Sequence, residues 1–360
     1  MENTTLLVTL AYHNSSVMNE QFVCHQNLLC VFSMVINSLT FLSGVVGNGL
    51  VIFITGFYMK KTVNTIWFLN LAIADFTFTF FLPLNIVYLA LGFHWPFGEA
   101  MCKFCSTTVL VNLHASVYFL MIISVDRCIS VRYPVWARNH RTIRLASFVA
   151  LGVWILALAL SSPNLQFRKT VRDRDSVWCH REFSSDEEQA KTIHRAVVIS
   201  QFILTFAVPF SVIAVCYGVI VLQLKSERLT SKPFKVITAV IVAFFVCWFP
   251  YHVLAFLKVQ AAEDHTLSPL ITVGAPLISS LAFVNSCLNP ILYIFMGRGI
   301  KQRLKRSILS IFGNAFSEEF SQSTKQERMT DRSHCNVNIS RLVNFSPISQ
   351  GQEEVTSIHG

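Results

Sequence analysis

Charged side chains are scarce in this sequence: aspartate, glutamate, lysine and arginine make up 14% of its 360 residues. Soluble domains contain about 25% of such residues. Hydrophobic residues account for 53% of the chain, and the mean hydropathy is +0.51. The shortage of charge excludes an ordinary water-soluble fold. It therefore excludes soluble enzymes and also the nucleic-acid-binding proteins that a net charge of +9 would otherwise suggest.

The uncharged residues are gathered in seven stretches, each close to or above the roughly 20 residues that cross a bilayer as a helix. We therefore predict an all-α protein, a seven-transmembrane helix bundle. The expected spans are residues 28–57, 66–93, 107–131, 146–162, 197–224, 234–257 and 267–296.

Lysine and arginine are absent from the first 25 residues, whereas Lys60 and Lys61 follow the first span and four arginines follow the third. Basic residues favour the cytoplasmic side, so we expect the N-terminus outside the cell and the C-terminus inside. The loop between spans four and five is also rich in basic residues, but its acidic residues nearly balance them. No basic segment and cleavage site precede the first span, which indicates an uncleaved anchor. The expected location is the plasma membrane.

Residues 1–27 form an expected extracellular segment with two sequons, which begin at Asn3 and Asn14. Both asparagines are predicted glycosylation sites on this side of the membrane.

Most of the ten cysteines lie inside the spans, where a thiol packs as a small hydrophobic group. Cys102 and Cys179 lie at or near the expected extracellular surface, and we expect a disulfide between them. Cys24 and Cys105 are further candidates for a bridge, with free thiols as the alternative.

Asp75 is the sole charged residue in the second span. A charge at this depth is costly, which makes it a candidate functional group. One interpretation is an allosteric Na⁺ site, and the other is a protonated aspartate in a structural hydrogen-bond network. The neighbouring spans supply amide and hydroxyl groups from Asn48, Asn112, Ser116, Asn285 and Asn289.

Prolines interrupt five of the spans, and each permits a kink because it removes a backbone hydrogen bond. A bundle of kinked helices with an interior polar network and Asp126-Arg127 at its cytoplasmic edge is typical of a two-state switch. The prolines are Pro83, Pro163, Pro209, Pro250 and Pro290.

A set of motifs occurs in the correct spans and order for one receptor family. They are Gly47-Asn48, Leu71-Ala72-Ile73-Ala74-Asp75, Asp126-Arg127-Cys128, Trp154, Pro209 with Tyr217, Phe244 with Cys247-Trp248-Phe249-Pro250, and Asn289-Pro290-Ile291-Leu292-Tyr293. Residues 28–312 thereby resemble the rhodopsin-like G-protein-coupled receptors. Trp95-Pro96-Phe97-Gly98, the segment Pro134–Thr142 and the segment Leu281–Pro290 narrow the resemblance to the chemoattractant branch. That branch includes the formyl peptide, chemerin, D-series resolvin and second prostaglandin D2 receptors.

This resemblance implies a cell-surface receptor in leukocyte migration or inflammation. It also implies a heterotrimeric G protein of the Gi class, arrestin and receptor kinases as partners. In the resting state Arg127 is expected to pair with Asp126. The implied switch residues are Asp126, Arg127, Tyr217, Phe244, Trp248, Pro250, Asn289, Pro290 and Tyr293.

The ligand is expected to be an extracellular peptide or an acidic lipid mediator. Formyl peptide receptors hold the formyl group with an acid in span three and two arginines in span five. Leu110, Val197 and Gln201 stand at the matching positions, so formylated peptides are not expected to bind in that way. The predicted lining is Asn85, Tyr88, Val109, Leu110, Leu113, His114, Arg168, Gln201, Tyr251, His252, Ala255, Lys258 and Ser279.

Two interpretations are open for each charged or imidazole side chain of this predicted lining. Arg168 and Lys258 are expected either to bind a ligand carboxylate or to lie solvated at the membrane interface. His114 and His252 either contact the ligand or are hydrogen-bonded interior histidines.

After the last span, the sequence of residues 297–312 predicts a short amphipathic eighth helix on the inner leaflet. Basic residues lie between its apolar positions. Residues 313–360 predict a disordered, phosphorylatable cytoplasmic tail. The helix is followed by no nearby cysteine for palmitoylation, since the next is Cys335.

Three other classes compete with a signalling receptor. An enzyme is disfavoured because no loop holds a catalytic domain and no span carries a paired acid and base. A transporter should show internal repeats or a polar lane through the bundle, whereas these polar residues converge on one region. An arrestin-biased or decoy receptor remains an alternative. No resident cofactor is expected apart from Na⁺ at Asp75.

Overall fold

The computed structural model describes residues 28–173, 176–227, 232–261 and 268–296, with the side chains of some of these left out. The predictions for residues 1–27, including Asn3, Asn14 and Cys24, and those for residues 297–312 and 313–360 lie outside the described residues.

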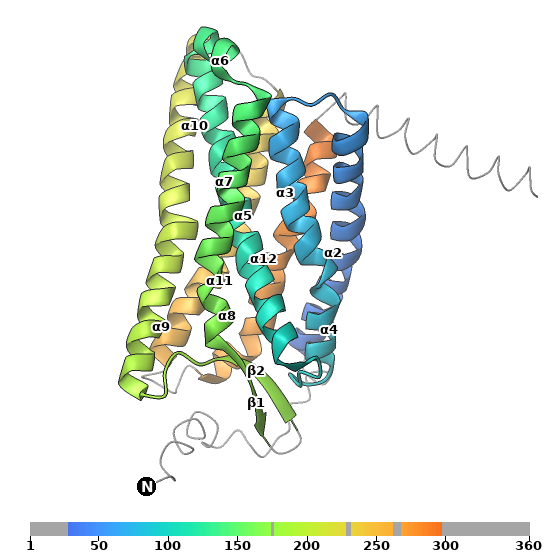
Figure 1. Cartoon of the computed structure of the whole chain (residues 1–360), viewed down its shortest axis with the longest axis vertical. Helices are drawn as coiled ribbons and strands as arrows, with labels where there is room; N and C mark the ends of the chain where they lie inside the picture. Colours follow the sequence, from blue (N-terminus) through green and yellow to red (C-terminus); the bar gives the residue numbers. More distant parts are fainter. Residues whose placement is uncertain (1–27, 174–175, 228–231, 262–267, 297–360) are drawn as a thin grey trace, which may run out of the picture. The chain divides into compact units, whose positions relative to one another are not determined.

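Long helices lie side by side in the described part of the chain (Figure 1). Six helical segments among the described residues are long and apolar enough to cross a membrane. A further helix, α12, contains no charged residue along its 29 residues. These seven agree in order with the predicted spans and support the seven-helix bundle.

The helical segments have the following bounds. The first is α2 (Leu28–Phe53) with the π-helical η2 (Ile54–Tyr58), the second is α3 (Val63–Phe80) with α4 (Leu82–Ala90), and the third is α5 (Gly98–Arg132). After the short loop helix α6 (Pro134–His140), the fourth is α7 (Ile143–Ser161) with α8 (Pro163–Phe167). The fifth joins α9 (Glu187–Phe202), the π-helical η3 (Ile203–Ala207) and α10 (Val208–Glu227), and the last two are α11 (Lys232–Ala261) and α12 (Ser268–Met296).

Two helices begin well before the spans that hydropathy predicts. α5 starts at Gly98, where Glu99 pairs with Lys103 at 2.6 Å. α9 starts at Glu187, after Asp186 accepts a hydrogen bond from the backbone of Gln189. Capping groups and ion pairs one turn apart stabilise helix in water. A hydropathy window does not detect these first helical turns, because their residues are polar.

The buried face of the first helix carries most of its polar side chains, and its exposed positions are mainly apolar. Its exposed positions include Leu28, Phe32, Leu39 and Val46. This arrangement suits a helix whose outer face contacts lipid, because lipid solvates apolar groups and the bundle interior satisfies the polar ones. The buried positions are Cys30, Ser33, Asn37, Thr40, Gly44, Asn48 and Val51.

Two glycines let this helix approach its neighbours closely. A Cβ atom on Gly44 would lie 2.5 Å from the Cγ2 atom of Thr79, and one on Gly47 would lie 2.9 Å from Pro290. Small residues at such contacts permit the close helix packing common in membranes.

The predicted interruptions occur at three of the five prolines. α3 and α4 meet just before Pro83, α7 and α8 meet just before Pro163, and the π-helical η3 ends two residues before Pro209. Pro250 and Pro290 lie within continuous α11 and α12. The sequence did not predict the π-helical turns.

A two-stranded hairpin lies at the end of the bundle opposite α6, here called the hairpin end (Figure 1). Its strands β1 (Arg168–Asp173) and β2 (Ser176–Arg181) pair antiparallel. The sequence analysis missed this hairpin, because neither strand shows the alternation of apolar and polar residues that identifies a strand in a sequence. The helical fold class is otherwise as predicted.

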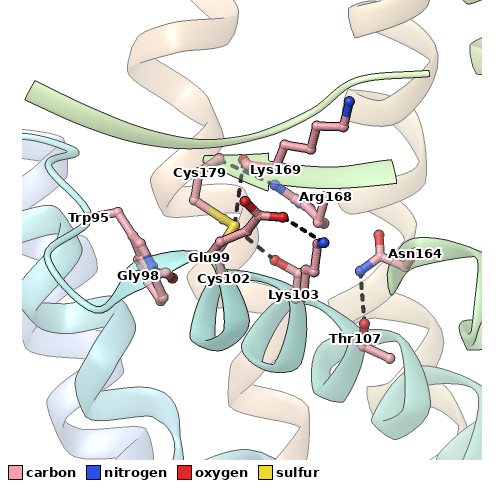
Figure 2. Close-up of a disulfide and its surroundings, with 11 residues drawn as sticks. Trp95, Gly98, Glu99, Cys102, Lys103, Thr107, Asn164, Arg168, Lys169 and Cys179 are labelled. Carbon is pink, nitrogen blue, oxygen red and sulfur yellow. Dashed lines mark hydrogen bonds and ion pairs between the residues drawn. A yellow bond between two sulfur atoms is a disulfide. The ribbon is translucent and has the colours of Figure 1, made fainter. Parts of the chain in front are cut away.

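The predicted disulfide between Cys102 and Cys179 joins the first turns of α5 to β2 (Figure 2). The backbone amide of Trp95 also donates to the carbonyl of Val177, and its indole donates to the carbonyl of Gly98, both at 2.8 Å. The hairpin is therefore fixed to the bundle by a covalent bond and by the preceding loop.

Two further cysteines, Cys105 and Cys30, bear on the prediction of a second disulfide. Cys105 is a free thiol, so the structure does not support a second bridge through it. Cys30, which the sequence analysis placed inside a span, is also disulfide-bonded.

Candidate ligand site and conformational switch

Asp75 lies at the centre of a fully buried polar network between α3, α5 and α12. Its Oδ1 accepts from Asn112 Nδ2 at 3.0 Å and from Ser116 Oγ at 3.5 Å, and its Oδ2 accepts from Asn289 Nδ2 at 2.7 Å. Asn48 on α2 donates to the carbonyl of Ser286 at 2.8 Å. The structure thus brings the residues predicted from four separate helices into one site.

Some oxygen atoms of this network have no partner. Asn48 Oδ1 and Asn289 Oδ1 are buried and accept no hydrogen bond from any described residue. Asn285 makes no hydrogen bond with a described residue of this network, since its amide oxygen and nitrogen are both buried and unpaired. Unpaired carbonyl oxygens beside a buried carboxylate are the ligands that a hard cation prefers. The residues present therefore fit a Na⁺ ion. Ser286, which also donates to Asn112 Oδ1 at 3.4 Å, belongs to this network and was missed.

Trp248 and Phe244 lie one turn apart on α11 and are almost completely buried. Their rings are 6.1 Å apart, and the Trp248 ring meets Tyr251 edge-on at 5.4 Å. The Trp248 indole N–H has no acceptor among the described residues. The three rings are thus in contact one after another along α11.

Phe206, in the π-helical η3, is the centre of an aromatic cluster between the fifth and sixth helices. Its ring lies 5.2 Å from Phe245, 5.7 Å from Phe249 and 5.4 Å from His252. The sequence analysis did not identify this cluster. Its signal was the spacing of Phe202, Phe206 and Phe210, which repeats every four residues and marks one helical face.

Both predicted histidines are interior residues with hydrogen-bond partners. His114 Nδ1 lies 2.8 Å from the Leu110 carbonyl and 3.0 Å from Ser161 Oγ. His252 Nε2 lies 3.4 Å from Thr205 Oγ1. These contacts agree with the structural alternative stated for each histidine.

The hairpin end carries a group of cations, here called the cation cluster: Arg168, Arg181 and Lys258. Arg168 and Arg181 are paired in register across β1 and β2, and Lys258 on α11 is close enough to both to be repelled by them. Arg168 Nη1 donates to the Cys179 carbonyl at 3.3 Å (Figure 2).

Acidic partners are missing from this cluster within the described part of the chain. Glu182 pairs with Lys169 instead, at 3.2 Å. The Nε atoms of Arg168 and Arg181 are buried and donate to no described residue. Burial lowers the pKa of Arg168 to about 10, and the charge of Arg181 acts in the same direction. Arg168 is still protonated at pH 7, so the cluster holds unneutralised positive charge that favours an anion.

The other predicted lining residues are distributed between the core and this end. Gln201 has a buried amide nitrogen that donates to no described residue, and Asn85 accepts from Asn37 at 3.2 Å. Leu110 and Leu113 are buried. Partly buried positions are Tyr88, Val109, Tyr251, Ala255 and Ser279, with Tyr88 and Tyr251 beside Arg168.

Asp126 does not pair with Arg127, contrary to the expectation from the resemblance. Both carboxylate oxygens are held by Arg141, with Nε to Oδ1 at 2.6 Å and Nη2 to Oδ2 at 2.8 Å. Arg127 Nε is buried and donates to no described residue. Tyr217 lies near Arg127, as predicted, whereas the side chain of Tyr293 is outside the described residues.

Comparison with known proteins agrees with this architecture. Residues 47–293 match the model of the 7 transmembrane receptor (rhodopsin family). The chain is 45% identical over 312 residues to chemerin-like receptor 1 of Rattus norvegicus, covering 82% of each chain. It is 43% identical over 310 residues to formyl peptide receptor 2 of Mus musculus, covering 82% of this chain and 88% of that receptor.

A third relative is the C3a anaphylatoxin chemotactic receptor of Danio rerio, 44% identical over 303 residues, with 83% of this chain and 82% of that receptor covered. The family model spans well over half of the chain, and its bounds enclose the Asp75 network, Asp126-Arg127 and the cation cluster. The chain belongs to the rhodopsin family of seven-transmembrane receptors.

Proposed function

We propose that this receptor binds a chemoattractant bearing a carboxylate and activates a heterotrimeric G protein of the Gi class. The cation cluster carries this proposal, because Arg168, Arg181 and Lys258 converge without an acidic partner among the described residues. Arg168 and Arg181 are partly buried, whereas Lys258 is exposed. An ion pair with a partly buried arginine is stronger and more directional than one at the surface. A peptide C-terminus or an acidic lipid supplies the missing charge.

The relatives support a chemoattractant role, since their names specify chemerin, formyl peptides and C3a. Formylated peptides are the least suitable of these ligands. Leu110 and Gln201 are neutral where a charged clamp for the formyl group is expected, and Val197 is apolar. Losing two charge-assisted hydrogen bonds of about 1.5–3 kcal/mol each weakens binding by about a hundredfold or more.

The hairpin end is proposed to face outward, together with the N-terminus. The disulfide between Cys102 and Cys179 supports this orientation, because such bonds persist in oxidising compartments. Lys60, Arg138 and Arg144 lie toward the opposite end and suit the cytoplasmic side. There the G protein binds, and receptor kinases and arrestin are the proposed partners of residues 313–360.

Na⁺ is the proposed allosteric ion of the Asp75 network. Asp75 and Ser116 would hold it, with Asn48 and Asn289 supplying further oxygen atoms. When bound, the ion supplies the positive charge that the buried carboxylate otherwise lacks. Because an ion shifts an equilibrium only by its different affinity for the two states, its effect should appear as a change in agonist affinity.

The test is a ligand screen on cells that express the full chain. Chemerin, C3a, N-formylated peptides and oxygenated fatty acids are compared by their inhibition of cyclic AMP, with and without pertussis toxin. Each active ligand is then tested as its carboxyl amide or methyl ester. We expect the neutral derivative to lose about tenfold or more in potency, and the toxin to abolish the response.

Equal potency of the acid and its neutral derivative would overturn the carboxylate proposal. A response that survives pertussis toxin would overturn the Gi assignment. Nanomolar activation by an N-formylated peptide would contradict the argument from Leu110 and Gln201. Recruitment of arrestin without any G-protein response would favour the arrestin-biased alternative.

A further inference from the structure

His194 lies on α9, just before the span predicted at residues 197–224. Its imidazole ring stacks on the ring of Phe183, with the ring centroids 5.2 Å apart and the planes 22° apart. Phe183 in turn contacts the ring of Phe167 on α8 at 5.1 Å, and the backbone amide of Glu182 donates to the carbonyl of Phe167 at 2.8 Å. The end of the hairpin therefore fixes the place of this imidazole.

The charges that act on this imidazole are those of the cation cluster. Arg181 ends β2, two residues before Phe183, and both Arg181 and Lys258 on α11 repel a proton on His194. Arg195, the next residue of α9, is a further cation and is exposed. Burial lowers the pKa of His194, and the charges of Arg181 and Lys258 lower it further. A neutral, half-buried histidine therefore borders the cluster at pH 7.

The acidic side chains of the neighbouring elements pair with other cations. Glu182, after β2, pairs with Lys169 at 3.2 Å. Glu187 and Glu188, at the start of α9, pair with Lys191 at 2.8 Å and 3.4 Å. The short helix α8 carries no charged residue. Among the described residues, no carboxylate is left to neutralise a proton on the imidazole.

A carboxylate bound at the cation cluster would change this balance. An anion beside an imidazole raises its pKa, because it stabilises the protonated ring. Histidine normally titrates close to physiological pH, so a change in its surroundings moves its protonation across the mildly acidic range. Linkage requires that the proton and the anion increase the affinity for each other by the same factor. Mild acid should therefore tighten the binding of the anion.

We propose that His194 is a titratable partner of the cation cluster and that its protonation strengthens the binding of a carboxylate. At pH 7 the site acts through its two arginines and Lys258, and in mild acid it gains a further positive charge. The inference rests on the carboxylate site of the proposed function, and it adds a proton to what that site takes up. An acidic ligand then binds more tightly in acidified surroundings than at neutral pH.

Binding of acetate to purified receptor is the direct test, with acetamide as the neutral probe. Saturation-transfer NMR measures both affinities at pH 7.5 and at pH 6.0 and at constant ionic strength, since acetate stays largely ionised at both values. We expect the wild-type affinity for acetate to be about threefold higher at pH 6.0, and acetamide to show no such rise. His194→Phe keeps a ring that stacks on Phe183 but takes up no proton, so it should lose the rise.

His180→Gln is the matched control. His180 is next to Arg181 on β2, and neighbouring side chains on a strand lie on opposite faces. The acid Glu182 also acts on His180, so this variant should keep the full rise. His194→Lys supplies a cation at both pH values and should give at pH 7.5 the affinity that the wild type reaches at pH 6.0. An equal rise in His194→Phe, or no rise in the wild type, would overturn the proposal.

Arg168→Gln separates this inference from the proposed function. It should weaken acetate binding at both pH values, because Arg168 belongs to the cluster whether or not His194 is protonated. Weaker binding in this variant, together with pH-independent binding by the wild type, would leave the carboxylate site intact and reject the role of His194. Acetate binding that is absent from the wild type, or equal in Arg168→Gln and the wild type, would reject the carboxylate site itself and the role of His194 with it.

Discussion

Arg168 and Arg181 lie directly opposite one another in the antiparallel pair of β1 and β2. Like charges at such positions normally repel and destabilise a hairpin. The disulfide at Cys179 and the contacts of Trp95 hold the hairpin in place nonetheless. The fold therefore holds two positive charges close together beside Tyr88 and Tyr251. An anionic ligand bound there would reduce the repulsion between Arg168 and Arg181.

Replacing either arginine of this pair should weaken the response to an acidic agonist. Arg168→Gln and Arg181→Gln should each reduce potency by about tenfold or more, because each removes a charge-assisted contact. Lys258→Gln tests the third cation in the same way. Concentration–response curves for cyclic AMP inhibition measure the effect at matched surface expression.

Arg172→Gln is the matched control for these variants, since Arg172 is an exposed arginine on the same strand. Its potency should equal that of the wild type. Unchanged potency in the Arg168, Arg181 and Lys258 variants would show that the cation cluster does not bind the agonist.

Asp75→Asn should abolish any dependence of agonist affinity on Na⁺. The neutral amide keeps the size of the side chain but removes the charge that would bind the ion. Competition binding in NaCl and in choline chloride at equal ionic strength measures the difference. Should wild-type affinity already be the same in both salts, the ion proposal is wrong, and the hydrogen-bond network of Asn112 and Asn289 remains a structural one.

Cys102→Ser and Cys179→Ser should each strongly reduce surface expression or ligand binding. Either change frees the hairpin from the start of α5 and so displaces Arg168 and Arg181. Antibody labelling of intact cells and radioligand binding measure the two effects. Mass mapping of non-reduced wild-type protein should recover the linked peptides, and recovery of both as free thiols would contradict the disulfide.

Gly44→Ala should destabilise the contact between the first and second helices. The added Cβ would meet Thr79 Cγ2 at 2.5 Å, and overpacking of this kind costs about 1–3 kcal/mol. The thermal midpoint of purified receptor in detergent should fall by several degrees.

Thr79→Ser removes the nearest methyl group and should restore part of the stability lost in Gly44→Ala. Gly152→Ala is the control, because a Cβ at that position meets nothing within 4 Å, and its thermal midpoint should be unchanged or slightly higher. A fall of equal size in Gly152→Ala would show that the loss in Gly44→Ala does not depend on contact with Thr79.

The sequence analysis identified the Asp75 network but not its full membership. Asn48, Asn112, Ser116 and Asn289 stood out because polar side chains are rare inside apolar spans. Ser286 was missed, because only its place on α12 brings it to Asn112. The histidines were ambiguous for a related reason, because a partner such as Ser161 or Thr205 lies on another helix.

The expectation that Arg127 pairs with Asp126 came from the family resemblance, and the structure shows Asp126 in a different ion pair. Asp126 and Arg127 are neighbours, and neighbouring side chains on a helix point in different directions. Asp126 instead meets Arg141, 15 residues away and on the other side of the loop helix α6. Arg181 was not predicted as part of the ligand site, because only the strand register places it opposite Arg168.

The sequence by itself determined the spans, their order and the disulfide between Cys102 and Cys179. Hydropathy is a local property, and the bilayer requires about 20 apolar residues wherever a helix crosses it. The tertiary structure decided which polar groups meet. It alone placed Arg141 on Asp126, because an arginine from any element that packs nearby can meet a carboxylate with the right geometry. It also placed Arg168 opposite Arg181, because the register of the two strands, and not the attraction of their side chains, decides which residues face each other.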